Sequence, residues 1–226
     1  MRPFYLNGMM RAMVFALVGI FTPVYIYHLV GLWAVLVYYG LLRLTTLITV
    51  LPVAKIIENI GFRRSIALSI IFLAGSLAGL LRAELDPRYL WAAAILSGVN
   101  VSFYWVARNS AISQDSQTKR VGSQMGVMTS VEQAATMLGP LTAGLVIERW
   151  GFPTLYMLAI LILVVSVVPL WGMHSHVHRN GASWRGFWRW IKGRSYFHNA
   201  VGVAGKAVDE YAINVMWPLI IFLLGV

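Results

Sequence analysis

The sequence has no cysteine and little charge, since only 12% of its 226 residues are Asp, Glu, Lys or Arg. Without cysteine the chain can form neither a disulfide nor a thiolate metal site. Soluble domains carry about 25% charged residues, so this composition cannot cover a water-exposed surface. A hydrophobic share of 59% and a mean hydropathy of +0.72 predict an integral membrane protein.

Motifs for catalysis and nucleotide binding are also missing. The chain has no Walker loop, no Ser-His-Asp grouping and no clustered His/Glu metal motif. We therefore expect no enzymatic activity, no cofactor and no bound metal, and an ATP-driven pump is disfavoured. Acidic residues are scarce, and the net charge is +10. The basic residues lie between apolar runs and not on a soluble module, so no nucleic-acid partner is expected.

What the sequence does contain is a series of long apolar runs. Six of them occupy residues 12–30, 33–53, 65–81, 89–107, 122–147 and 153–173, and a seventh begins near residue 199. Each is about as long as a bilayer core requires, and only helices satisfy the backbone of such runs in lipid. Pro23 predicts a kink in the first run. Gly75 and Gly79 give the third run a face for close helix contact.

The runs predict an all-α membrane fold in three parts. We expect a six-helix bundle over residues 1–173, a cytoplasmic connector over 174–197, and the truncated first helix of a second half over 198–226. The first run lacks a small-residue cleavage site, so it is expected to be retained. In the connector, aromatic residues between Trp184 and Ile191 alternate with basic ones at helical spacing, which is typical of a helix lying at the membrane surface. His174, His176 and His178 precede it as a polar exit from the membrane.

The basic residues also predict an orientation. With the N-terminus inside, thirteen of the eighteen Lys and Arg residues fall in inner segments and three in outer turns. This imbalance follows the positive-inside rule. We therefore expect a cytoplasmic N-terminus and a multi-pass protein of a prokaryotic inner or plasma membrane, in contact with anionic lipid.

A short motif occurs twice, ninety residues apart. Ile57-Glu58-x-x-Gly61-Phe62 returns as Ile147-Glu148-x-x-Gly151-Phe152, in both cases after the second apolar run of a set of three. The predicted topology puts the two copies on opposite sides of the membrane. Residues before and after residue 88 would then form two inverted three-helix repeats, an arrangement common in secondary transporters.

Ionisable residues inside the runs are the candidates for function, because each costs about 2.5–3.5 kcal/mol to insert. The candidate substrate or ion pathway comprises Tyr25, Arg43, Asn100, Tyr104, Glu132, Lys206, Asp209 and Glu210. Arg43 and Glu132 lie near the expected midplane, and we predict that both face the bundle interior. Glu132 is the better proton carrier of the two, since arginine stays charged. The alternative is that these polar groups only bond neighbouring helices.

The first copy of the motif resembles the major facilitator superfamily. That family carries G-x-x-x-D-R-x-G-R-R between its second and third helices, and Gly61, Arg63 and Arg64 match it here. Glu58 keeps the carboxylate, whereas Ala54 and Asn59 depart from the pattern. In the fifth run, Gly139-Pro140-x-x-Ala143-Gly144 looks like the G-P-x-x-G-G element of antiporter members.

The resemblance implies a secondary transporter, or permease, that moves a small molecule by alternating access with a midplane site. It also implies that Glu58, Gly61, Arg63 and Arg64 form a conformational switch, and that a second half of the usual twelve-helix fold is missing. Proton antiport in the export direction is favoured by the Gly139, Pro140 and Gly144 element and by Glu132. The alternatives are a lipid flippase of the same fold and a non-transporting membrane scaffold or sensor.

Overall fold

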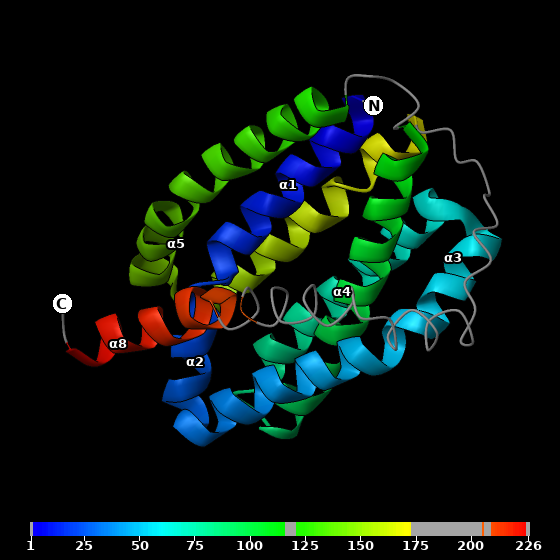
Figure 1. Cartoon of the computed structure of the whole chain (residues 1–226). Helices are drawn as coiled ribbons and strands as arrows, with labels where there is room; N and C mark the ends of the chain where they lie inside the picture. Colours follow the sequence, from blue (N-terminus) through cyan, green and yellow to red (C-terminus); the bar gives the residue numbers. More distant parts are fainter. Residues whose placement is uncertain (1, 116–120, 173–204, 206–208, 225–226) are drawn as a thin grey trace.

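The computed structural model describes residues 2–115, 121–172, 205 and 209–224, and every element in these ranges is helical (Figure 1). The elements are α1 (Arg2–Val18), α2 (Phe21–Val30), α3 (Leu32–Arg82), α4 (Arg88–Asp115), α5 (Val121–Val165), the 3₁₀ helix η1 (Val168–Gly172), the π-helix η2 (Ala212–Met216) and α8 (Trp217–Leu224). The predicted all-helical class is confirmed for these residues.

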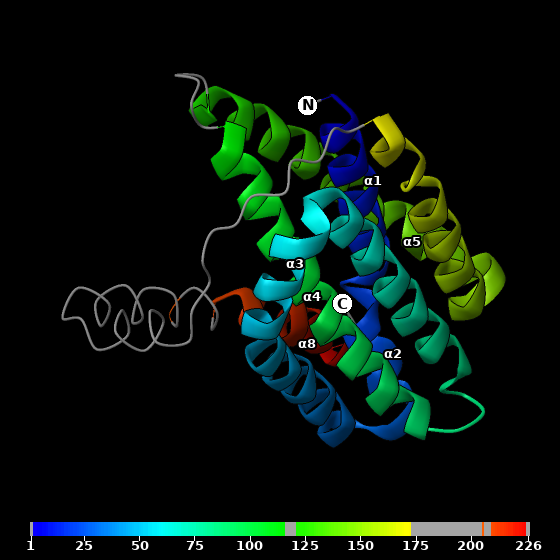
Figure 2. The same cartoon turned by 90° about the vertical axis from the view of Figure 1, so that its right-hand side faces the viewer.

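Helix α3 folds back on itself at Gly61, where the backbone leaves helical geometry with φ 80° and ψ 160°. Its first half runs parallel to α4 and its second half antiparallel, as Figures 1 and 2 show. The contacts that fix these directions join Thr46 with Gly98, Thr49 with Ser102, Phe72 with Phe103 and Ser76 with Ser97. The segment expected as a loop around Gly61 is therefore helical on both sides of one glycine.

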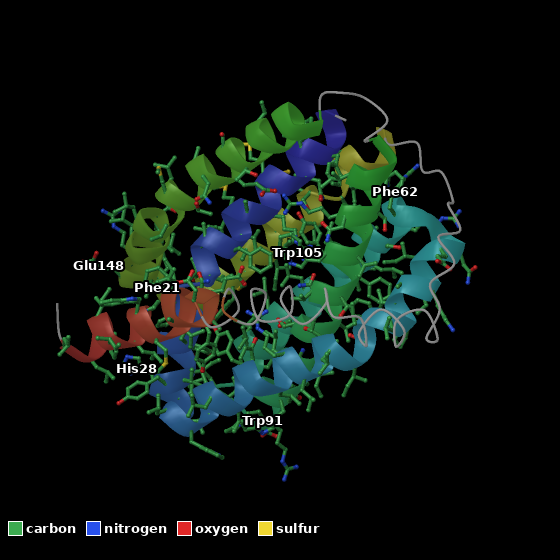
Figure 3. All side chains as sticks on the ribbon, viewed as in Figure 1. Phe21, His28, Phe62, Trp91, Trp105 and Glu148 are labelled. Atoms are coloured by element: carbon green, nitrogen blue, oxygen red, sulfur yellow. The ribbon has the colours of Figure 1, made fainter. Side chains whose placement is uncertain are left out.

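Helix α5 folds back in the same way at Gly151, with φ 78° and ψ 174°. Both glycines occupy a region of positive φ that residues with a Cβ rarely adopt. The repeated motif thus corresponds to two joints with nearly the same backbone conformation. Phe62 beside the first joint and Glu148 beside the second lie on opposite sides of the molecule (Figure 3).

Four stretches are long and apolar enough to cross a membrane: Phe4–Val30, Leu32–Arg82, Arg88–Ile112 and Glu132–Gly172. A bilayer core needs about 20 helical residues, and the second and fourth stretches have 51 and 41 residues. Each of these two contains a joint. The chain is therefore an integral membrane protein, while the division into six passes and two inverted repeats stays a prediction.

The first transmembrane segment begins earlier than the expected residue 12. Helix α1 starts at Arg2 and ends at Val18, and the chain turns at Gly19–Ile20 before α2. Pro23 explains the interruption, since it cannot donate to the carbonyl of Gly19 and its ring crowds that carbonyl. The predicted kink is confirmed, but it lies one turn before the proline.

Small residues bring α3 and α4 together. A Cβ at Gly79 would lie 3.1 Å from the Cβ of Ala93, and one at Gly75 would lie 3.3 Å from Leu96. Closer still, a Cβ at Gly98 would lie 2.6 Å from the carbonyl oxygen of Leu42. The predicted contact face at Gly75 and Gly79 is confirmed, and Gly98 supplies a second one for the first half of α3.

The described part of the seventh run packs against the start of the chain. The ring of Phe222 in α8 lies 4.7 Å from that of His28 in α2, and Tyr211 lies 6.1 Å from Tyr39 of α3. The connector over 174–197, with its expected surface helix and its three histidines, lies outside the described residues. The proposed division into domains stays a prediction.

Candidate functional site

Helix α4 carries a polar stripe through the centre of the bundle. Ser97, Asn100, Tyr104 and Arg108 are three or four residues apart and therefore share one face of the helix. All four are buried. The hydroxyl of Ser97 lies 2.9 Å from that of Ser76, which ties α4 to α3. The other three residues face α1 and α5 and form a charged cluster.

Arg11 of α1 is the centre of this cluster and is only 2% exposed. Its Nη1 donates a hydrogen bond to the Oγ of Ser69 at 3.2 Å, and its Nη2 donates to the Oδ1 of Asn100. The guanidinium carbon lies 3.8 Å from the centroid of the Tyr104 ring, a cation–π contact. Among the described residues, no acceptor lies within hydrogen-bond reach of its buried Nε–H.

Arg108 of α4 pairs with Glu132 of α5. The Nη2 of Arg108 lies 3.1 Å from the Oε2 of Glu132, and the two side chains are 9% and 19% exposed. The guanidinium carbon of Arg108 lies 4.9 Å from the ring of Trp105 and 5.8 Å from that of Tyr104. Trp105, labelled in Figure 3, is itself exposed. Tyr104 therefore contacts both arginines.

The charge count placed Arg11 and Arg108 among the basic residues outside the apolar runs, but the structure places both inside helices. Helix α1 begins nine residues before Arg11, and α4 continues to Asp115. A signal for Arg108 was present, because extending the Asn100 and Tyr104 stripe by four residues reaches it. For Arg11, the corresponding signal was Asn7, four residues before it and also buried, which donates to the carbonyl of Ser166 at 2.7 Å.

Arg43 and Tyr25 lie apart from the contacts of this cluster. The side chain of Arg43 is exposed on α3 among the described residues, and its place in the pathway stays a prediction. Glu132 takes Arg108 as its partner. Tyr25 is buried, and its hydroxyl donates to the carbonyl of Leu80 at 3.0 Å. Its ring packs against Phe152 beside the second joint. These contacts join α2 to α3 and α5.

The candidates in the seventh run are only partly described. Asp209 is exposed, and the carbonyl of Glu210 accepts a hydrogen bond from the side chain of Asn214 at 2.8 Å. The π-helix Ala212–Met216 follows directly, and such turns are frequent at functional sites. Lys206 lies outside the described residues. A pathway role for these three residues stays a prediction.

The proposed switch residues surround the first joint. Gly61 is buried, Glu58 and Arg63 are half-buried, and Arg64 is exposed. The hydroxyl of Ser65 donates to the carbonyl of Gly61 at 2.8 Å and so closes the turn. Their proposed role in switching stays a prediction.

The glycines of the fifth-run element differ in their surroundings. A Cβ at Gly139 would lie 2.1 Å from the Cβ of Ala16 and 2.7 Å from its backbone carbon. Helix α5 therefore meets α1 there with no room for a side chain. Gly144 has nothing within 4 Å of such a Cβ, and Pro140 lies inside the helix. Only Gly139 is required by the described packing.

The cluster joins four segments through charge and hydrogen bonds: α1, the second half of α3, α4 and α5. It can hold an anion through arginine. In the residues that the structure describes, no group of three His, Asp or Glu side chains lies close enough to bind a metal ion.

The sequence profile of the Major Facilitator Superfamily matches residues 4–226. The match therefore includes all four membrane-spanning stretches and the cluster. No curated protein matches the chain.

Proposed function

The chain belongs to the Major Facilitator Superfamily, whose members are secondary transporters and not enzymes, and from this premise we propose that it moves a small molecule by alternating access coupled to protons. Arg108 and Glu132 are the proposed proton-responsive element. Alternating access requires contacts between polar groups that are made in one state and broken in the other. An ion pair between two helices at membrane depth has this property.

The observation that carries the proposal is the 3.1 Å contact between Arg108 and Glu132. A charged group in a membrane segment is retained at a cost in insertion free energy, so it is a functional candidate by default. A proton on Glu132 removes one charge of the pair and weakens its hold on Arg108. The ion pair then no longer holds α4 and α5 together, so the two helices can move relative to each other.

The finer features of this transporter are also proposals. The Gly139-Pro140 element favours proton antiport and export. The basic joint residues Arg63 and Arg64 fit an inner location beside anionic lipid headgroups, with Glu58 and Gly61 as parts of a switch. A plasma membrane with the N-terminus in the cytoplasm is the proposed location.

Solute-dependent proton movement in proteoliposomes tests the function. A pH-sensitive dye is enclosed, and a panel of neutral, cationic and anionic small molecules is added outside. We expect at least one solute to move protons, and Glu132→Gln to abolish this movement while solute exchange continues. The matched control is Glu148→Gln, an exposed carboxylate on the same helix, which should transport normally. Proton movement that is unchanged in Glu132→Gln would contradict the proposed role.

The absence of cysteine makes the orientation directly testable. Single cysteines at the exposed positions Asn59 and Glu148 report on the two joints. We expect an impermeant maleimide added to whole cells to label Glu148→Cys and not Asn59→Cys. The reverse pattern would invert the topology, and labelling of both positions would refute the placement of the joints on opposite sides.

A further inference from the structure

Arg11 is short of a counter-ion. Within the part of the chain that the structure describes, its hydrogen bonds go to the neutral side chains of Ser69 and Asn100, and no carboxylate contacts it. Its buried Nε–H also finds no acceptor in these described ranges. A buried charge normally has a partner, because leaving it unpaired costs several kcal/mol. The site is therefore incomplete as it stands.

The charges of the cluster indicate how much charge the missing counter-ion carries. Arg11 and Arg108 are cationic and Glu132 is anionic, so these three side chains sum to a net charge of +1. One monovalent anion would neutralise them. A phosphate carries about −1.5 to −2 at neutral pH and would exceed this, whereas a carboxylate carries −1.

The shape of the site agrees with a carboxylate. A guanidinium is a planar fork that binds a carboxylate through two parallel hydrogen bonds, and the Nε–H of Arg11 is a donor still available for one. The surroundings are aromatic: the guanidinium carbon of Arg11 lies 5.4 Å from the Phe15 ring and 3.8 Å from the Tyr104 ring, and Trp105 lies beside Arg108. An apolar body next to the carboxylate would find matching surfaces.

We propose that the transported solute is an organic monocarboxylate with an apolar body, and that Arg11 binds its carboxylate with help from Arg108. This inference rests on the proposed transport function. Arg11 is enclosed in this conformation, so the solute reaches it when α1 and α4 separate, as alternating access requires. Asn100 and Ser69 position the guanidinium of Arg11 for the incoming carboxylate.

The same geometry fixes the sign of proton coupling. The groups that face Glu132 are Arg108 and Tyr104 of α4, and Arg11 of α1 lies against the same Tyr104 ring. An arriving carboxylate competes with Glu132 for Arg108. A proton on Glu132 removes this competitor, so proton and carboxylate strengthen each other's binding. Both would then move in the same direction, in contrast to the antiport that the fifth-run element favours.

Binding to the purified full chain in detergent tests the solute class. Benzoate, benzamide and benzylamine share one ring and differ in charge, and hexanoate adds an aliphatic carboxylate. We expect both carboxylates to bind by calorimetry and to raise the thermal midpoint, and the other two probes to do neither. Glu132→Gln removes the carboxylate that competes for Arg108, so it should raise the affinity for benzoate.

Two variants link the binding to Arg11. Asn100→Asp places a carboxylate where the Oδ1 of Asn100 now accepts from Nη2, so it supplies an internal counter-ion and should lower benzoate affinity at least tenfold. Arg11→Gln keeps hydrogen bonding without the charge and should lower it at least as much. Because Arg11→Gln removes a buried group, Asn100→Asp is the safer test, since its fold should be stabilised.

Several outcomes would overturn the inference: no binding of either carboxylate, binding of benzylamine in their place, or carboxylate binding that is unchanged in Asn100→Asp. The proposed transport function would survive each of these outcomes if another solute still drove proton movement through Glu132. Conversely, carboxylate binding without any solute-dependent proton movement would contradict the transport function and leave the binding site in place.

Discussion

Helix α4 meets its two sets of neighbours in different ways. Toward α3 its contacts are neutral: Thr49 and Ser102 share a hydrogen bond of 2.8 Å, Ser76 and Ser97 one of 2.9 Å, and Gly98 allows close approach. Toward α1 and α5 the contacts are charged, through Arg11, Arg108 and Glu132. The same helix thus has a hydroxyl seam on one face and a charged cluster on another.

The two faces of α4 differ in whether their contacts are needed only to join helices. Hydroxyl and glycine contacts are an ordinary way to join membrane helices, and such hydrogen bonds contribute about 0.6 kcal/mol on average. Two buried arginines would join helices at a much higher cost in insertion free energy. If helix association were the only requirement, the hydroxyl seam would meet it. We therefore expect the charged cluster to serve solute or proton handling, and Arg108→Ala and Ser76→Ala test this contrast directly.

The largest expected effect is at the ion pair. Arg108→Ala leaves Glu132 without its partner at membrane depth and should lower the free energy of unfolding by about 3–5 kcal/mol if the carboxylate stays charged. Chemical denaturation in mixed micelles at pH 8 measures this change. Arg64→Ala, an exposed arginine, is the control and should change stability by less than about 0.5 kcal/mol.

Next in size are the joints. Gly61→Ala and Gly151→Ala each force a Cβ into positive φ and should cost about 1–3 kcal/mol. The two losses should be similar, because the backbone conformations are nearly the same. A loss confined to Gly61→Ala would mean that the joints are unequal in stability and that the repeat is superficial.

At the contact of α5 with α1, Gly139→Ala should cost about 1–3 kcal/mol, since the added methyl would overlap Ala16. Gly144→Ala offers the matched control on the same helix, with open space around the new methyl. It should be neutral or stabilise by up to about 1 kcal/mol. Equal thermal midpoints for the two variants would contradict the close approach at Gly139.

The smallest effect is expected in the hydroxyl seam. Ser76→Ala removes bonds to Ser97 and to the carbonyl of Ala93 and should cost about 0.6 kcal/mol without changing transport. Ser130→Ala, at an exposed position of α5, should change neither the free energy of unfolding nor transport. A large loss of transport in Ser76→Ala would remove the distinction between the two faces of α4.

The sequence alone was sufficient for the membrane class, the helical fold, the repeated joint and the Gly75–Gly79 contact, because each depends on composition or local spacing. It was not sufficient for the cluster. Arg11 and Arg108 stand at the borders of apolar runs, where a basic residue ordinarily marks a loop. Their burial depends on helices that extend beyond those runs and on packing between α1, α4 and α5, which hydropathy does not report.

The close contact of α5 with α1 at Gly139 is a point about which α5 can rotate. Helix α5 touches the backbone of α1 there, and its two arms differ in length: Glu132 lies seven residues to one side and the second joint twelve to the other, about 10 Å and 18 Å along the axis. Pro140 beside this point weakens one helical hydrogen bond.

A rocking of α5 by about 10° about this point would move the two ends in opposite directions, by about 2 Å at Glu132 and 3 Å at Gly151. The first displacement is enough to separate Glu132 from Arg108, whose contact is 3.1 Å. Opening of the cluster at one end of α5 would therefore shift the Tyr25–Phe152 packing at the other end through the movement of the helix itself.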